Sequence, residues 1–243
     1  MNRPLLSVVI PAYNEENSIE KLLGVVFSVP PKKEVIVIND GSRDRTKEIL
    51  SSLERRFSGG SPYPNVSGLK IVHKTKNEGK GAALRDGFKL ASGDIVTIQD
   101  ADLEVDPHEY MILLEPFEKY GADIVFGSRL LKKENLVKFS RPALYANKFL
   151  TFVSNLLSGA RLTDMETCYK VFRREIIQSF SLTAKKFGIE PELAAKAAQT
   201  GKKIYEVPIS YHPRTKAQGK KIGVIDGVKA LGEIVKYNLF RRQ

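Results

Sequence analysis

The sequence predicts an α/β fold in which a mostly parallel central sheet carries helices on both faces. Three observations lead to this prediction. The first half of the chain alternates short, continuous apolar runs with amphipathic stretches of about 10–15 residues, which is the pattern of βαβ units. Polar, acid-bearing turns follow the apolar runs, at the edge where parallel sheets bind ligands. The length of 243 residues suits one large α/β domain.

In the first half, each element follows from its own residues. Strands are expected where β-branched residues form short apolar runs, at residues 6–10, 34–38, 69–73, 94–98 and 123–126. Helices are expected at residues 15–27, 44–57, 79–91 and 107–120. Ser42 or Asp44 can cap the second helix, and Pro107 opens the fourth. Residues 58–68 are rich in Gly, Ser and Pro and are expected to form a loop.

The second half is less regular and more basic. A basic loop at residues 128–141 precedes an amphipathic stretch at residues 143–157. Strands are expected at residues 168–172 and 203–207, with a helix after the first of them and another at residues 190–200. A second basic loop at residues 211–221 leads to a last helix at residues 224–240.

Charge is divided unevenly along the chain. The 39 Lys and Arg residues exceed the 28 Asp and Glu residues by 11, and this excess lies wholly in the second half: residues 1–120 have a net charge of −2 and residues 121–243 a net charge of +13. Such an excess indicates an anionic partner, either nucleic acid, a membrane surface or a phosphorylated substrate. The single cysteine, Cys168, excludes an internal disulfide framework and a Cys-rich metal site, and it favours a reducing compartment.

Acidic residues follow three of the first four expected strands. The most informative of these acidic turns is Asp100-Ala-Asp102-Leu-Glu104, because carboxylates two residues apart can converge after a strand and supply the oxygen ligands that Mg²⁺ or Mn²⁺ prefers. Such an ion needs few protein ligands when phosphates supply the rest. The alternative is that these acids merely cap the next helix. Their position at the rim of a parallel sheet, near two further acidic turns, favours a binding site.

Four motifs in order resemble the family 2 glycosyltransferases, which have the GT-A fold, a Rossmann-like α/β architecture. They are residues 9–15 (VIPAYNE), 37–42 (VINDGS), 77–81 (NEGKG) and 100–102 (DAD). Residues 127–129 (GSR), 169–172 (YKVF) and 212–216 (HPRTK) resemble the dolichyl-phosphate mannose and glucose synthase branch of that family. The resemblance implies that residues 1–127 form the nucleotide-sugar-binding half. Residues 128–243 would then form the acceptor-binding half of a single domain, with amphipathic helices facing a membrane.

The resemblance also assigns residues to the donor. Those expected to bind the nucleotide sugar are Pro11, Tyr13, Glu15, Asp40, Lys80, Asp100 and Ala101. Asp102 and Glu104 would coordinate the divalent cation, Mg²⁺ or Mn²⁺, that bridges the diphosphate, and Asp100 and Asp102 are counted as catalytic. The sequence departs from the family pattern at two positions. Asn39 stands where relatives often have Asp, and Glu104 stands where they often have Gln.

Basic residues are expected to hold the acceptor. The predicted acceptor-phosphate residues are Ser128, Arg129, Arg141, Arg214 and Lys216, with Arg129 also counted as catalytic. Any one basic loop residue taken alone is more often a solvated surface group.

An acid near residue 164 is the remaining catalytic candidate. Related inverting enzymes keep an acid in this region to activate hydroxyl acceptors, and the resemblance gives this catalytic position to Asp164, with Glu166 as the near alternative. Either acid could instead orient Arg or Lys side chains around an acceptor phosphate.

No stretch is expected to span a membrane. Residues 143–157 and 224–240 are amphipathic, and each is expected to serve partly as core and partly as an interfacial helix on an anionic membrane surface. The protein is therefore expected to be cytoplasmic and peripheral on the cytoplasmic face of a membrane. A membrane-protein partner is a further possibility.

The resemblance implies an inverting hexosyltransferase that uses GDP-mannose or UDP-glucose and a polyprenyl phosphate such as dolichyl phosphate. One alternative is a family 2 glycosyltransferase that acts on a glycan or another hydroxyl acceptor. A more distant one is a basic nucleic-acid-binding protein, but the sequence has no helix-turn-helix, RNA-binding or zinc signature, so no nucleic-acid partner is expected. A sugar-nucleotide sensor without activity is disfavoured by the intact residues 100–104.

Overall fold

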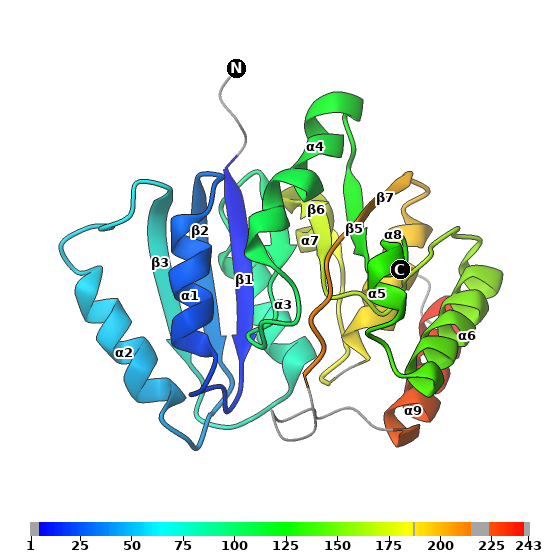
Figure 1. Ribbon diagram of the computed structural model, residues 1–243, viewed down its shortest axis with the longest axis horizontal. Coiled ribbons are helices and arrows are strands. Elements are labelled where there is room, and N and C mark those ends of the chain that lie inside the picture. The colour runs from blue at the N-terminus through cyan, green and yellow to red at the C-terminus, as the bar shows by residue number, and fades with distance from the viewer. Residues whose placement is uncertain (1–4, 187, 215–223, 241–243) are drawn as a thin grey trace.

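The computed structural model describes residues 5–186, 188–214 and 224–240, and within them the chain forms a seven-stranded sheet with the order β3-β2-β1-β4-β6-β5-β7 (Figure 1). The strands are β1 (Leu6–Ala12), β2 (Lys33–Asn39), β3 (Val66–His73), β4 (Ile95–Ile98), β5 (Ile124–Ser128), β6 (Lys170–Arg173) and β7 (Ile204–Pro208). Each coincides with a strand expected from the sequence. The predicted α/β fold with a mostly parallel sheet is confirmed.

One strand runs against the others. β6 pairs antiparallel with both β4 and β5, whereas β1 pairs parallel with β2 and β4, β2 with β3, and β5 with β7. Because β6 comes late in the chain and lies between two earlier strands, both halves share one sheet. The functional division predicted between residues 127 and 128 falls inside β5, and it stays a prediction about function within a single domain.

Helices cover both faces of the sheet, as expected (Figure 1). They are α1 (Ile19–Ser28), α2 (Thr46–Arg56), α3 (Lys80–Leu90), η1 (Pro107–Glu109), α4 (Tyr110–Tyr120), α5 (Lys133–Leu136), α6 (Arg141–Ser158), α7 (Arg174–Ser179), α8 (Ile189–Gln199), α9 (Val224–Val235) and the π-helical segment η3 (Lys236–Phe240). The short helix α5 lies in what was expected to be a basic loop.

The first helix begins later than expected, at Ile19 instead of residue 15. The backbone amides of residues 14–16 are bound by side chains that follow β2, at 2.9 to 3.1 Å: Asn14 by Ser42, Glu15 by Thr46 and Glu16 by Asp44. These hydrogen bonds tie the end of β1 to the end of β2 and hold residues 14–16 out of the helix.

The core lies in two layers, one on each side of the sheet. In β1, Val8 and Ile10 pack against α1 and α4, whereas Val9 packs against α3 on the opposite face. Each such fully buried aliphatic side chain contributes about 1.5–3 kcal/mol through its removal from water. Gly87 lets α3 approach closely, because a Cβ at this position would lie 2.3 Å from Cγ1 of Val9.

The architecture brings the carboxyl ends of β1, β2 and β4 to one rim, as parallel strands require. Helices α6 and α9 pack together at the end of the molecule away from β3 (Figure 1). Across the described ranges, no helix is both long and apolar enough to cross a membrane.

Candidate active site

The acidic rim is built on two strained turns. Asn14 has a φ of 54° and Leu103 a φ of 61°, both in the left-handed region that side chains other than glycine rarely adopt. Leu103 separates Asp102 from Glu104, so the turn folds back sharply after β4. Strain of this kind persists only where the surroundings impose it, and it is concentrated at functional sites.

Asp40 fixes the turn that precedes α3. Its carboxylate accepts hydrogen bonds from the backbone amides of Glu78 at 3.1 Å and Gly79 at 2.7 Å, and it lies 3.3 Å from Nζ of Lys74. Gly79 has a φ of 98°, and a Cβ there would lie 2.2 Å from the carbonyl oxygen of Lys185. Asp40 is only 2% exposed. The structure thus gives Asp40 the role of holding the turn that carries Lys80, and its direct contact with a nucleotide stays a prediction.

Lys80 joins two acids from distant parts of the chain. Its Nζ lies 2.7 Å from Oδ1 of Asp100 and 2.7 Å from Oε1 of Glu190, at the start of α8. Burial alone would lower the pKa of Lys80, but the two carboxylates outweigh burial and raise that pKa well above its ordinary value. The lysine is therefore charged and holds the Asp100 carboxylate in a fixed place.

Arg214 lies among the acids that were expected to bind metal. Its Nη2 is 3.1 Å from Glu15 and 3.6 Å from Oδ2 of Asp102, and its backbone amide donates to Oε1 of Glu104 at 2.9 Å. The described residues contain no group of three or more His, Cys, Asp or Glu side chains that could hold a metal ion. Asp102 and Glu104 still fit a cation whose other ligands are phosphates. Both are carboxylates, and the guanidinium beside them shows that this place accommodates positive charge.

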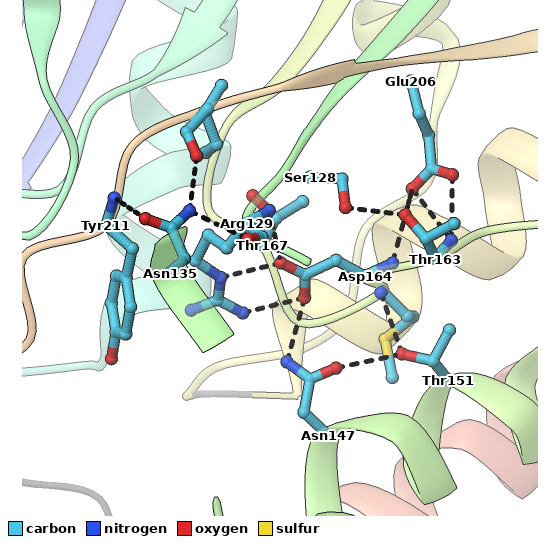
Figure 2. Close-up of polar contacts among 12 residues, drawn as sticks. Ser128, Arg129, Asn135, Asn147, Thr151, Thr163, Asp164, Thr167, Glu206 and Tyr211 are labelled. Carbon is cyan, nitrogen blue, oxygen red and sulfur yellow. Dashed lines mark hydrogen bonds and ion pairs between the residues drawn. The ribbon is translucent and has the colours of Figure 1, made fainter. Parts of the chain in front are cut away.

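A second polar cluster surrounds Asp164 (Figure 2). Asp164 accepts hydrogen bonds from Arg129 through Nε at 2.7 Å, Nη2 at 2.9 Å and the backbone amide at 3.0 Å, and from Nδ2 of Asn147 at 2.9 Å. Asp164 is fully buried. Arg129 directly follows β5, at the carboxyl end of that strand. Burial would raise the pKa of Asp164, but Arg129 outweighs it and holds that pKa below its ordinary value. Asp164 is therefore ionised and serves as the counter-ion of Arg129.

Several polar groups hold this cluster in place. Glu206 on β7 binds the backbone amide of Thr163 at 2.9 Å, and Ser128 bonds to the Thr163 hydroxyl at 2.6 Å. Lys170 donates from Nζ to the carbonyls of Met165 and Thr167. The loop that carries Asp164 is thus fastened to β5, β6 and β7.

Tyr211 connects the two clusters. Its ring lies under the guanidinium of Arg129, with 5.2 Å between Cζ and the ring centroid, and its hydroxyl is hydrogen-bonded to Glu104. Burial, followed by the charge of Glu104, raises the pKa of Tyr211 to about 12. Asn135 holds this arrangement, because its side chain bonds to the carbonyl of Arg129 at 2.8 Å and to the amide of Tyr211 at 3.1 Å.

Glu166 differs from the other acids because one of its oxygens, Oε1, is buried without a hydrogen-bond partner. Burial, and then the charge of Glu190, raise the pKa of Glu166 to about 7. The rim thus combines a fixed guanidinium, a set of acidic side chains suited to a cation, and one carboxyl group that can exchange a proton near neutral pH.

Comparison with known families decides what kind of protein carries this site. The family described as Glycosyl transferase family 2 matches residues 7–180, which is most of the chain. The chain belongs to this family.

The relatives of this family 2 glycosyltransferase include enzymes named for lipid-phosphate acceptors. It is 30% identical over 222 residues to dolichol-phosphate mannosyltransferase of Pyrococcus furiosus, covering 90% of this chain and 59% of the relative. It is 28% identical over 240 residues to undecaprenyl-phosphate mannosyltransferase of Micrococcus luteus, covering 96% of this chain and 94% of the relative. It is also 26% identical over 257 residues to a dolichyl-phosphate beta-glucosyltransferase of Trichomonas vaginalis, covering 98% and 74%.

Solved structures confirm the fold of the glycosyltransferase. The crystal structure of glucosyl-3-phosphoglycerate synthase from Mycobacterium tuberculosis, in complex with Mn²⁺, UDP and phosphoglyceric acid, matches with a TM-score of 0.66. The match has 20% sequence identity and covers 96% of this chain and 78% of that one. At this identity the likeness establishes the GT-A architecture.

The structure places the remaining predicted residues of the glycosyltransferase as follows. Pro11 and Tyr13 are half-buried at the end of β1, and Ala101 is buried beside Asp100. Arg141 is exposed as the first residue of α6. Ser128 is fully buried, and Lys216 lies outside the described residues. The structure groups Arg214 with Glu15 and Asp102, which were expected to bind the donor and the metal, whereas Arg129 pairs with Asp164.

Several site residues were missed by sequence reasoning. They are Asn135, Asn147, Glu190, Glu206 and Tyr211. None belongs to a local motif that reveals its partner, since the partners lie far away in the sequence. Lys80, for example, lies at the start of α3, whereas Glu190 lies at the start of α8. No local sequence pattern can link two residues so far apart.

Proposed function

We propose that this glycosyltransferase moves a hexose from GDP-mannose or UDP-glucose to a polyprenyl phosphate such as dolichyl phosphate, with inversion at the anomeric carbon. The observation that carries the proposal is the Arg129–Asp164 pair. A guanidinium whose plane is fixed by a buried carboxylate suits recognition of a phosphate group. The names of the relatives, which refer to dolichol, dolichyl and undecaprenyl phosphate, support this acceptor.

The donor is assigned to the acidic rim. Asp102 and Glu104 would hold Mg²⁺ or Mn²⁺, and such an ion would supply Lewis-acid stabilisation of the departing diphosphate. Lys80 orients Asp100 toward the sugar nucleotide. The residues that line the nucleotide-sugar site are Pro11, Tyr13, Glu15, Asp40, Lys80, Asp100 and Ala101.

The acceptor needs no general base. A phosphate monoester carries an anionic oxygen near neutral pH, so this oxygen can attack the anomeric carbon while the bond to the diphosphate breaks on the opposite face. No proton has to be removed in this step. The contribution of Arg129 is to hold and orient the acceptor, which is catalysis by positioning and electrostatics. Asp164 holds Arg129 and takes no proton, because its carboxylate is buried and ion-paired.

Helix α6 is assigned to the lipid surface. Its aromatic and aliphatic residues Tyr145, Phe149, Phe152 and Leu156 are 55% to 71% exposed and recur at helical spacing on one face. We assign this face to an anionic bilayer, because Arg141 and Lys148 lie on the same helix and the second half of the chain carries a charge of +13. The protein would then be peripheral on the cytoplasmic face of a membrane. If a membrane protein recruited it instead, membrane binding would not require anionic lipid.

The test is the release of nucleotide. The protein is incubated with a panel of GDP- and UDP-hexoses, a polyprenyl phosphate and Mg²⁺ or Mn²⁺, and free GDP or UDP is measured. We expect release that requires both the lipid phosphate and the metal, with a β-linked product from the α-linked donor. Absence of release with every donor would refute the proposal.

One observation favours transfer to a hydroxyl acceptor. Glu166 has a buried oxygen without a partner and a pKa raised to about 7, which are properties of a general base. Under this alternative, Glu166→Gln abolishes turnover on a glycan acceptor, whereas Arg129→Ala leaves that turnover intact. The proposed lipid-phosphate reaction predicts the opposite order of sensitivity.

A further inference from the structure

The guanidinium of Arg214 occupies the centre of the donor-side acids. It touches Glu15 from the end of β1 at 3.1 Å and Asp102 at 3.6 Å, and its Nε donates to the carbonyl of Asp102 at 3.0 Å. The side chain is only 16% exposed. Two acids from two turns, Glu15 and Asp102, therefore lie beside a single guanidinium that comes from more than 100 residues later in the chain.

The segment that carries Arg214 is attached to the same turn by its backbone. The amide of His212 donates to the carbonyl of Glu104 at 2.8 Å, and the amide of Arg214 donates to Oε1 of Glu104 at 2.9 Å. The contacts of Arg214 thus involve both carboxylates that are assigned to the divalent cation. A divalent cation bound to Asp102 would lie close to the guanidinium and be repelled by it, and a cation bound to Glu104 would compete with the backbone amide of Arg214.

We propose that Arg214 is a displaceable counter-ion of the donor site, whose guanidinium gives up Asp102 to the divalent cation, while its backbone amide releases Glu104, and takes the nucleotide diphosphate as its new partner. The proposal rests on the metal-dependent function above and reassigns Arg214 from the acceptor phosphate to the donor. A cation that arrives alone must displace Arg214 without compensation. A cation that arrives with a diphosphate brings negative charge that receives the freed guanidinium.

The consequence is a coupling between metal and nucleotide. Each should raise the affinity of the protein for the other by the same factor, since the coupling of two equilibria is reciprocal. Removing Arg214 should act in opposite directions on the two ligands. The metal alone binds more tightly because its competitor is gone, whereas the nucleotide in the presence of metal binds more weakly because it has lost a partner.

The experiment measures binding, without turnover. Free Mn²⁺ is counted by electron paramagnetic resonance during titration of the protein, first alone and then with UDP or GDP, and nucleotide binding is measured with and without Mn²⁺ by calorimetry. For Arg214→Ala we expect Mn²⁺ alone to bind about tenfold more tightly. The factor by which Mn²⁺ raises the affinity for the nucleotide should fall by about tenfold, the size expected when one partly buried charge pair is lost. Arg214→Gln, which keeps most of the side-chain volume, should behave in the same way.

Lys138→Ala is the matched control. Lys138 is an exposed cation that reaches the carbonyl of Tyr211 at 3.0 Å, next to the same segment, and the described structure records no ion pair between it and the donor acids. It should leave the coupling unchanged. Equal weakening of both ligands in the Arg214 variants, with unfolding midpoints like that of the native protein, would overturn the counter-ion role in favour of a structural one. Failure of Mn²⁺ to bind at all with any nucleotide would instead refute the metal site, and with it the metal dependence of the proposed function.

Discussion

Glu166 is the residue in which burial and charge conflict most directly. The groups around it are Glu190 and Asp164, which disfavour its ionisation, and Lys170 and Arg129, which favour it. Burial is the largest contribution, and the pKa of Glu166 rises from 4.5 to about 7. The folded protein therefore binds this proton more tightly than the unfolded chain does.

This difference predicts how stability depends on pH. Between about pH 4.5 and pH 7 the folded state holds the Glu166 proton and the unfolded state does not, so the contribution of Glu166 to stability falls as the pH rises through this window. Glu166→Gln should remove this dependence and stabilise the protein at pH 8 by about 2 kcal/mol. Urea unfolding at pH 5, 6, 7 and 8 measures both effects. Parallel curves for the two proteins would contradict the prediction.

Asp164 and Arg129 differ from Glu166 because each neutralises the other. Removing one partner of a buried pair leaves an uncompensated charge, at a cost of about 3–5 kcal/mol. Asp164→Asn should therefore release Arg129 from its fixed plane, raise KM for the lipid phosphate more than tenfold and leave the affinity for the nucleotide near its native value. If Asp164 were instead a general base, the same change would lower kcat with little effect on KM. Steady-state kinetics with both substrates varied distinguishes the two roles, and a double-mutant cycle with Arg129→Lys measures their coupling.

At the scale of elements, α6 places three polar side chains toward the protein together with Leu150, and exposes several large apolar side chains to solvent. Asn147, Thr151 and Ser154 are buried, and the first two hold the loop that carries Asp164. Its opposite face exposes Phe149 and Phe152. Because the side of α6 that faces the protein is already packed and hydrogen-bonded, the exposed apolar face is available for another surface.

This face predicts membrane binding that depends on hydrophobic contact. Each aromatic side chain that enters the interface contributes up to about 2 kcal/mol, so the double variant Phe149→Ser, Phe152→Ser should bind liposomes at least tenfold more weakly. Co-sedimentation with vesicles measures the partitioning. Tyr120→Ser is the control, because Tyr120 is 65% exposed, close to the 63% of Phe152, but lies on α4. An equal loss of liposome binding in Tyr120→Ser would contradict the assignment of the membrane-binding face to α6.

The elements also show what the sequence can predict. β1, β2 and β4 are nearly continuous buried runs, so both their existence and their polar ends could be located, and with them Asp100 and Asp102. The direction of β6 could not be predicted, because four residues with the sequence KVFR pair equally well in either orientation. No local sequence pattern predicts that Lys80 contacts Glu190 or that Asp164 contacts Asn147. These contacts exist only because the sheet and α6 bring together segments that are distant in sequence.

At the scale of the whole molecule, the uneven division of charge bears on the proposed separation of donor and acceptor. The acids that converge on Arg214 come from the near-neutral first half, whereas Arg129, Arg141 and Lys148 belong to the half with a net charge of +13. Both halves share one sheet through β6, so the two regions are joined by one core. Under the proposed function, an anionic surface can approach the basic half without competing for the acids that are proposed to hold the donor.

This separation predicts a specific dependence on salt. Binding to vesicles that contain anionic lipid should weaken steeply between about 50 and 500 mM NaCl, because the Debye length falls from more than 10 Å to less than 5 Å over this range. Binding to neutral vesicles, which relies on the exposed face of α6, should change little. Nucleotide binding should also be much less sensitive to salt than anionic vesicle binding, since its charged contacts are partly buried. Parallel titrations of vesicle and nucleotide binding test this, and equal salt dependence of the two would contradict the assignment of the basic half to the membrane.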